Sequence, residues 1–218
     1  MIAALFPFLI IFSWLVLVFI IAFICKQRFP KTKELTRKII HIFTGPIIPI
    51  AYWLDVSKEL GVLIGSMISI GLIINQKVKL IPAIEDINRK SYGTTLYPIS
   101  ITLLFLFFWP ENAYAVIAGV LVMAFGDGFA GLIGKHIPSM NWKIFGQRKS
   151  IAGTLTMSVI SGSVLLVMLL ITGEPINAPQ ILMITFLAVI VEQISSLGID
   201  NISVPFCVAL GWLWLVNI

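Results

Sequence analysis

One stretch of the sequence reads AYAVIAGVLVMAFGDGFAGLIGK, from Ala113 to Lys135. Before the final lysine, its only charged side chain is Asp127, which lies among apolar and small residues. A transmembrane helix needs about 20 consecutive, mostly apolar residues to cross a hydrocarbon core of roughly 30 Å. The stretch therefore predicts a membrane-spanning helix from Ala113 to Gly134 that carries an acidic side chain.

The rest of the chain has the same apolar character. Hydrophobic residues make up 59% of the sequence and charged residues 11%, whereas about a quarter of a typical soluble domain is charged. The other apolar runs are Ile2–Ile24, Ile39–Leu54, Leu60–Asn75, Thr95–Trp109, Ile151–Thr172, Ile181–Leu197 and Ile202–Val216. We predict an all-α fold, a polytopic membrane bundle of about eight transmembrane helices. Without long linkers, residues 1–218 should form a single integral-membrane domain.

Fourteen of the 15 Lys and Arg residues fall into three connections between these runs. They are Lys26, Arg28, Lys31, Lys33, Arg37 and Lys38, then Lys77, Lys79, Arg89 and Lys90, then Lys135, Lys143, Arg148 and Lys149. Such residues concentrate on the cytoplasmic side of membrane proteins. This pattern predicts that the three basic connections face the cytoplasm and that both termini lie on the non-cytoplasmic side. Topology and attraction to the anionic lipid bilayer account for the net charge of +5, so no nucleic acid is expected as a partner.

Three carboxylates are expected at the cytoplasmic boundary. Asp127 lies inside its span, Glu192 near the inner end of the seventh, and Asp200 in the short turn before the eighth. An ionised carboxylate inside a membrane is costly unless it is paired or coordinated. Hard oxygen ligands beside clustered cations suit Mg²⁺ held together with substrate phosphates. Pairing of Asp127 with a buried lysine or arginine is the less favoured alternative, since no such residue lies inside a predicted span.

Candidate phosphate-binding residues surround the third basic connection. Backbone N–H groups at the start of a helix bind anions, and small residues allow a phosphate or another helix to approach closely. The candidates are Gly126, Gly128, Gly131, Gly134, Lys135, Lys149, Ser150, Gly153 and Thr154, with Asn201 beside Asp200. Close helix packing is the alternative role for the glycines, and topology alone can explain the basic residues.

A further group of residues is expected near the substrate. Arg37, Lys38 and His41 lie at the inner start of the second span, where they could contact a phosphate or a headgroup. Tyr92 and Gly93 precede the fourth span and could form part of a pocket wall. The alternatives are a structural role for His41 and an interfacial anchor and turn at Tyr92 and Gly93.

Five segments, in order, resemble the CTP-dependent polyprenol kinase family, which includes phytol kinase, dolichol kinase and the yeast-type diacylglycerol kinase. The segments are ELTRKIIHIFTG (34–45), RKSYGTTLYP (89–98), GDGFAGLIGK (126–135), KSIAGT (149–154) and EQISSLGIDNISVP (192–205). The resemblance implies transfer of the γ-phosphate of CTP to the hydroxyl of a membrane lipid alcohol such as phytol or a polyprenol. The reaction would use a divalent metal, Mg²⁺. The charge pattern places the expected active site on the cytoplasmic side.

The resemblance also assigns roles to matching residues. Asp127, Glu192 and Asp200 would hold Mg²⁺, or one of them would accept the hydroxyl proton. The triphosphate would lie against Lys135, Lys149 and the N–H groups near Ser150 to Thr154. In one departure, Ala152 stands where the family commonly has Glu. Which carboxylate is the base, which alcohol is used and whether CTP is preferred all stay open at this point.

Two other functions are compatible with part of this pattern. A phosphatidate cytidylyltransferase also brings CTP and Mg²⁺ to a lipid, but it makes a CDP-lipid, and its long acidic, glycine-rich C-terminal signature is not found here. A transporter would need charged residues near the middle of the membrane, and the sequence shows none there. The lipid kinase is therefore the favoured hypothesis.

Overall fold

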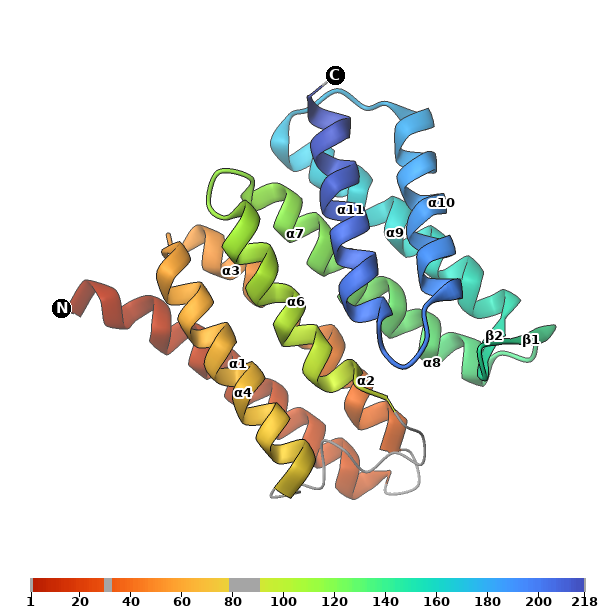
Figure 1. The fold of residues 1–218 in the computed structure, drawn as a ribbon, viewed down its shortest axis with the longest axis horizontal. Coiled ribbons are helices and arrows are strands. Elements are labelled where there is room, and N and C mark those ends of the chain that lie inside the picture. The colour runs from red at the N-terminus through yellow and green to blue at the C-terminus, as the bar shows by residue number, and fades with distance from the viewer. Residues whose placement is uncertain (1, 30–32, 79–90, 218) are drawn as a thin grey trace.

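The computed structural model describes residues 2–29, 33–78 and 91–217, a bundle of helices with one small hairpin (Figure 1). Four residues of the predicted basic clusters, Lys31, Lys79, Arg89 and Lys90, lie outside these ranges. The elements are α1 (Ile2–Arg28), α2 (Lys33–Thr44), α3 (Ile47–Trp53), α4 (Lys58–Val78), α6 (Gly93–Phe108), α7 (Ala113–Leu121), η1 (Val122–Asp127), α8 (Gly128–His136), β1 (Asn141–Ile144), β2 (Gln147–Ser150), α9 (Ile151–Thr172), α10 (Ala178–Ile194) and α11 (Asp200–Val216). The predicted all-α class is confirmed.

The segment from Ala113 to His136 is the central helix of the bundle. It comprises α7, the π-helical turn η1 and α8, and most of its side chains are buried. Small residues along it admit neighbouring backbones: a Cβ added at Gly119 would lie 2.4 Å from the Pro205 carbonyl oxygen of α11. Close approach of this kind is how helices pack in a membrane, where lipid competes for apolar contact.

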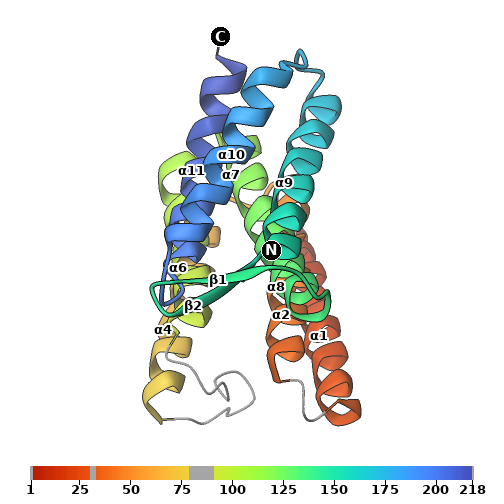
Figure 2. The same ribbon diagram turned by 90° about the vertical axis from the view of Figure 1, so that its right-hand side faces the viewer.

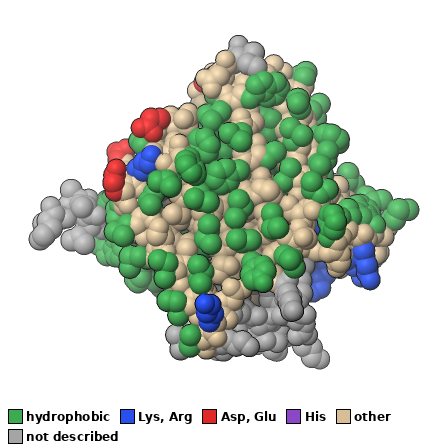
Figure 3. All heavy atoms as spheres, in the orientation of Figure 1, with side chains coloured by type: hydrophobic (Ala, Val, Ile, Leu, Met, Phe, Trp, Pro, Cys, Tyr) green, Lys and Arg blue, Asp and Glu red, His purple; other side chains and the backbone are tan. Residues whose placement is uncertain are grey.

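The outer surface of the bundle is apolar. Within the described ranges, four helices are long and apolar enough to cross a membrane: Phe6–Arg28, Lys58–Val78, Ala113–His136 and Ile151–Thr172. Large apolar side chains such as Leu63, Leu155 and Phe186 are more than half exposed, and Figure 3 shows hydrophobic side chains spread over one whole face. A soluble protein rarely exposes so wide an apolar surface. The chain is therefore a membrane protein.

The predicted second span, Ile39–Leu54, is divided into two helices. The chain breaks at Gly45 and Pro46, because proline has no N–H for the helix ladder and its ring crowds the preceding turn. A Cβ at Gly45 would lie 2.5 Å from the Ala124 Cβ, so the break also brings α2 against η1. Since α2 begins at Lys33, Arg37 and Lys38 lie inside a helix instead of before one.

The third basic connection contains an antiparallel hairpin that the sequence did not predict. Strands β1 and β2 pair Trp142 with Lys149, and in Figure 1 the hairpin projects beyond the end of α8. The Ser150 Oγ then caps α9 by accepting a hydrogen bond of 3.2 Å from the Gly153 N–H. The hairpin thus fixes Lys149 at the start of α9.

Helix ends that carry the basic residues gather on one side of the bundle. In Figure 1 the end of α8, the start of α9 and the turn between α10 and α11 lie toward the lower right, while the turns before α4 and before α10 lie on the opposite side. Figure 2 shows the pair α1 and α2 standing apart from the pair α4 and α6 at the lower end.

The predicted seventh helix ends at Ile194 instead of Leu197, and Asp200 is the first residue of α11 instead of part of the preceding turn.

Candidate functional site

A polar pocket of about 710 Å³ opens among α2, α8, the hairpin, the start of α9 and the end of α10. Eleven residues predicted from the sequence line it: Lys38, Asp127, Gly131, Gly134, Lys135, Lys149, Ser150, Gly153, Thr154, Glu192 and Asp200. They come from segments more than 150 residues apart in the chain. All three predicted carboxylates therefore face a single cavity together with lysine side chains.

Asp127 occupies the end of the π-helical turn and is held by two residues of α2. The Lys38 Nζ donates to the Asp127 Oδ2 at 2.7 Å and to its main-chain oxygen at 2.9 Å. The His41 Nε2 lies 3.5 Å from the same Oδ2. π-Helical turns occur frequently at functional sites, because the extra residue redirects the side chains that follow. Here the turn directs Asp127 toward α2.

The ion pair between Lys38 and Asp127 corrects the prediction that a buried cation was the less favoured partner. Lys38 has a side-chain exposure of only 4%, and Asp127 one of 14%. The apolar run that predicts the second span begins at Ile39, after Lys38, whereas α2 begins at Lys33 and carries Lys38 into the bundle. Breaking a buried pair by removing one partner typically costs about 3–5 kcal/mol, so the two groups fix each other's position.

Lys149, which lies just before the start of α9, holds Glu192. The Lys149 Nζ forms an ion pair with the Glu192 Oε1 and donates to the Glu192 main-chain oxygen at 3.0 Å. The Gln193 Nε2 donates to the Glu192 Oε2 at 3.0 Å and to the Thr154 Oγ1 at 2.9 Å. This network joins β2, α9 and α10 into one wall of the pocket.

Asp200 begins α11 and faces the same cavity. Its Oδ1 accepts hydrogen bonds from the Asn201 N–H at 3.2 Å and from the Asn201 Nδ2 at 3.1 Å. Within residues 2–29, 33–78 and 91–217, no Lys or Arg forms an ion pair with it. Asp127 and Glu192 lie within electrostatic range of this carboxylate. Lys38 and Lys149 also lie within electrostatic range of it, but neither forms an ion pair with it. Of the described carboxylates that line this pocket, Asp200 is thus the one without an ion pair.

The three carboxylates do not form a ready-made metal cage. Among the described residues, no three Asp, Glu, His or Cys side chains are close enough together to hold a metal ion. Asp127 and Glu192 already form ion pairs with Lys38 and Lys149, respectively. Magnesium in nucleotide sites is usually held by one or two carboxylates together with phosphate oxygens and water. The donor set therefore fits an ion that arrives with phosphate and does not fit an ion held by protein alone.

The start of α9 offers fewer free N–H groups than the sequence predicts. The N–H of Ile151 donates to the Met140 oxygen at 3.0 Å, that of Ala152 to the Ser139 Oγ at 3.2 Å, and that of Gly153 to the Ser150 Oγ. All three are satisfied within the protein. A phosphate group in this pocket would therefore have to be bound by side chains such as Lys135 and Lys149, which line it.

Some predicted residues lie elsewhere. Gly126 packs on Met157 of α9 and Gly128 on Ile42 of α2, the alternative role considered for these glycines. Asn201 packs against Gly93. Tyr92 is 51% exposed, and it lines neither this pocket nor the apolar pocket between α2 and α6. Polar residues that the sequence argument did not propose also line the cavity: Glu34, His136, Ser139, Asn141, Gln147, Arg148 and Gln193. Of these residues, only Gln193 lies directly beside a proposed residue, Glu192, inside one of the five segments that resemble the kinase family.

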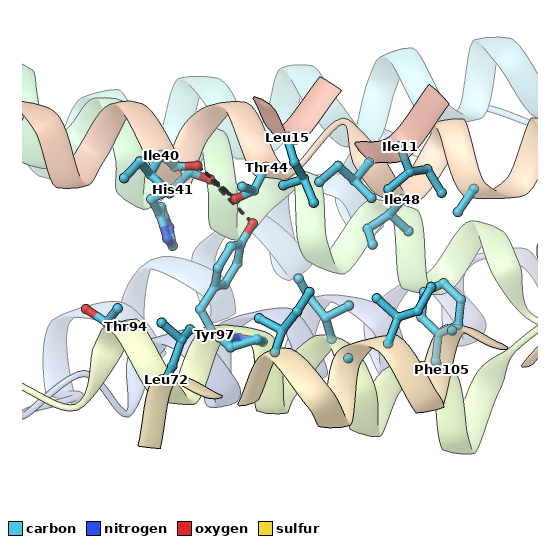
Figure 4. Close-up of a pocket in the computed structure, with 18 of the residues that line it drawn as sticks. Ile11, Leu15, Ile40, His41, Thr44, Ile48, Leu72, Thr94, Tyr97 and Phe105 are labelled. Carbon is cyan, nitrogen blue, oxygen red and sulfur yellow. Dashed lines mark hydrogen bonds between the residues drawn. The ribbon is translucent and has the colours of Figure 1, made fainter. Parts of the chain in front are cut away.

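A second, apolar pocket of about 340 Å³ lies between the pair α1 and α2 and the pair α4 and α6 (Figure 4). Three predicted residues line it, Arg37, His41 and Gly93. The His41 ring lies against Tyr97, with centroids 4.3 Å apart. Apart from Thr44 and Thr94, the remaining lining is apolar, as expected of a site for a hydrocarbon chain. The sequence did not predict this pocket.

The two pockets meet at α2. His41 lines the apolar pocket and touches Asp127, which lines the polar one. Lys38, one turn earlier on α2, lines the polar pocket beside the same carboxylate. A molecule with an apolar tail and a polar head could therefore place its head at Asp127 while its tail stays among the helices.

Comparison with known proteins gives relatives of one kind. The chain is 36% identical over 191 residues to phytol kinase of Synechocystis sp. (strain ATCC 27184 / PCC 6803 / Kazusa), covering 84% of this chain and 82% of the relative. It is 33% identical over 123 residues to probable phytol kinase 1, chloroplastic, of Glycine max, covering 52% of this chain and 40% of that protein. The probable phytol kinase 2, chloroplastic, of Glycine max is 24% identical over 203 residues, or 82% and 64% of the two chains. No protein-family model and no solved structure matches.

Proposed function

Because the chain belongs to the polyprenol and phytol kinase family, we propose that it is a membrane lipid-alcohol kinase. It transfers the γ-phosphate of CTP, or of another nucleoside triphosphate, to the hydroxyl of an isoprenoid alcohol. One observation carries the proposal beyond the family. A polar pocket with lysines and carboxylates and an apolar pocket between helices meet at Lys38, Asp127 and His41.

The geometry supports a direct transfer. The alcohol lies in the apolar pocket with its hydroxyl at His41, and the triphosphate lies in the polar pocket against Lys135 and Lys149. The hydroxyl oxygen forms a bond to the γ-phosphorus as the bond to the bridging oxygen of the nucleoside diphosphate breaks. The hydroxyl proton passes to Asp127, which Lys38 and His41 hold in place. Phosphoryl transfer depends mainly on positioning and charge neutralisation, and this pocket offers both.

A magnesium ion would complete the charge balance. When bound with the nucleotide, it would neutralise phosphate oxygens. Of the described carboxylates that line the polar pocket, Asp200 is the one that forms no ion pair, and Asp127 lies within electrostatic range of it. Glu192, held by Lys149, would keep that lysine aimed into the pocket. The base would then be Asp127 and the first metal contact Asp200.

The decisive experiment follows the γ-phosphate. Purified protein in detergent is incubated with phytol and CTP labelled in the γ-position, and the expected result is label in the extracted lipid. A phosphatidate cytidylyltransferase would instead release that label in pyrophosphate when given phosphatidate. A transporter would move solute across liposomes without nucleotide. Parallel reactions with ATP and UTP identify the preferred donor.

We also propose the finer topology, eight spans in one domain with both termini on the non-cytoplasmic side and the polar pocket facing the cytoplasm. Single cysteines are placed at Phe145, on the hairpin, and at Glu111, in the turn before α7, after Cys25 and Cys207 are changed to Ser. In intact cells an impermeant maleimide should label Glu111→Cys and leave Phe145→Cys unlabelled until the membrane is opened. The reverse labelling pattern would contradict this orientation.

Substitution of Gly131 by Ala should displace the Lys38 side chain while leaving its positive charge unchanged. An added Cβ would lie 2.7 Å from the Lys38 Cε and 2.9 Å from its Nζ, so the lysine must withdraw from Asp127. We expect kcat/KM for the alcohol to fall by about ten- to a hundredfold, because a misplaced catalytic group costs about that much. Gly71→Ala is the matched control, since its Cβ would meet nothing within 4 Å. Equal activities of the two variants would show that the position of Lys38 does not matter.

A further inference from the structure

The apolar pocket has two unlike ends. Figure 4 shows His41 and Thr94 at one end and Phe105, with Ile48 and Ile11, at the other. The first end adjoins Asp127 and the polar pocket. If the hydroxyl of the proposed alcohol substrate lies there, the far end of its hydrocarbon chain must point toward Phe105.

The Phe105 end is closed by a stack of aromatic rings. The rings of Phe105 and Trp109 are stacked with centroids 4.2 Å apart, and Tyr52 meets Trp109 edge-on at 6.1 Å. The Trp109 Nε1 donates to the Val56 oxygen at 2.8 Å, which ties this stack to the turn before α4. Phe105 is 4% exposed and Trp109 1%. A hydrocarbon chain that extends along α6 toward Trp109 would meet these packed rings.

A glycine of α4 fits against the same ring. A Cβ added at Gly61 would lie 2.3 Å from the Phe105 Cδ1, so any side chain there would displace the ring. Gly61, Phe105 and Ala51 all line the pocket. Gly61 therefore lets α4 approach α6 closely and also shapes this end of the apolar pocket.

The distance between the two ends limits the occupant. Phe105 lies twelve residues after Gly93 on α6, which corresponds to roughly 18 Å at about 1.5 Å per residue. This is close to the depth of one leaflet, about 15 Å, which an ordinary lipid tail spans. An alcohol of four isoprene units has a chain of comparable length, whereas a long polyprenol does not fit.

Resting on the proposed function, we propose that Phe105, seated against Gly61, sets the upper limit on substrate chain length. The enzyme takes alcohols of up to about four isoprene units, the class that includes phytol and geranylgeraniol, and rejects longer polyprenols. Phe105 thus acts as a specificity-determining residue at the end of the pocket that is remote from the chemistry.

The test compares chain lengths within each variant. The kcat/KM ratio of a five-isoprene alcohol, geranylfarnesol, to geranylgeraniol is measured for the wild type, Phe105→Ala and Phe107→Ala. Truncation of Phe105 should raise this ratio about tenfold, the factor expected for burying one or two more methylene groups. Phe107, on the same helix and 63% exposed, is the matched control and should leave the ratio unchanged. A ratio is insensitive to the fraction of folded enzyme.

A second variant fills the pocket in place of opening it. Ala51→Leu adds bulk at the closed end, so the ratio of geranylgeraniol to the three-isoprene alcohol farnesol should fall about tenfold. Unchanged ratios in both Phe105→Ala and Ala51→Leu, with farnesol still phosphorylated, would overturn the length limit alone. A wild-type protein that phosphorylates no alcohol would overturn the proposed function and the length limit with it.

Discussion

Replacement of Asp127 by Asn is expected to abolish lipid phosphorylation, lowering kcat/KM by about a thousandfold or more. The amide keeps the shape of the carboxyl group but cannot accept the hydroxyl proton. It also removes the negative charge that meets Lys38 at 2.7 Å and His41 at 3.5 Å. Since Lys38 lines the polar pocket and His41 lines the apolar one, the change affects the place where the proposed alcohol and nucleotide would meet. The measurement is transfer of γ-labelled phosphate to phytol.

Two controls make this result interpretable. Asp55→Asn introduces the same chemical change in the exposed turn before α4 and should retain wild-type activity. Thermal unfolding in detergent checks the fold, because Lys38 loses its buried partner in Asp127→Asn. A well-folded Asp127→Asn protein with wild-type activity would falsify the assignment of Asp127 as the base.

Much of the fold could be predicted from hydrophobic runs and charge. The central helix from Ala113 and α9, which begins at Ile151, appear at the expected positions, because long apolar segments leave few alternatives in a membrane. The break at Gly45 and Pro46 was missed, since a run of apolar residues does not show where one helix gives way to another. The hairpin was missed because its strands are four residues each and mostly polar.

The polar half of the site could also be predicted, whereas its pairing could not. Asp127, Glu192 and Asp200 were identified because carboxylates are rare in apolar segments and need partners. Those partners, Lys38 and Lys149, follow from where α2 begins and from how the hairpin turns, and both depend on contacts between distant segments. The apolar pocket depends wholly on such contacts, and its lining is indistinguishable in sequence from a lipid-facing surface.

The structure gives α2 a role that links the two pockets. Successive turns of this helix place Arg37 and His41 on the apolar pocket and Lys38 on the polar one. One short helix thus separates the apolar pocket from the polar one, and the contact of His41 with Asp127 joins them. This arrangement explains how a water-soluble phosphate donor could reach an alcohol whose tail stays in the membrane.

Substitution of Lys149 by Ala is expected to raise the KM for the nucleotide by about thirtyfold, since a charge-assisted contact with phosphate contributes about 2 kcal/mol. The KM for the alcohol should change little, because Lys149 lines the polar pocket and not the apolar one. Lys143→Ala is the matched control: Lys143 is an exposed residue of the same hairpin, outside both pocket linings. Steady-state kinetics with varied CTP and varied phytol give both constants.

Lys149 also holds Glu192, so its loss will destabilise the protein as well as the nucleotide complex. The double variant Lys149→Ala with Glu192→Gln separates these effects, because the neutral amide no longer needs a cationic partner. Its thermal stability should recover toward that of the wild type while the nucleotide KM stays high. If instead the KM for CTP returns to normal with stability, or never rises in Lys149→Ala, then Lys149 serves only to hold α10 against the hairpin. The phosphate contacts would then have to come from Lys135 and Arg148, the other basic side chains on that side of the cavity.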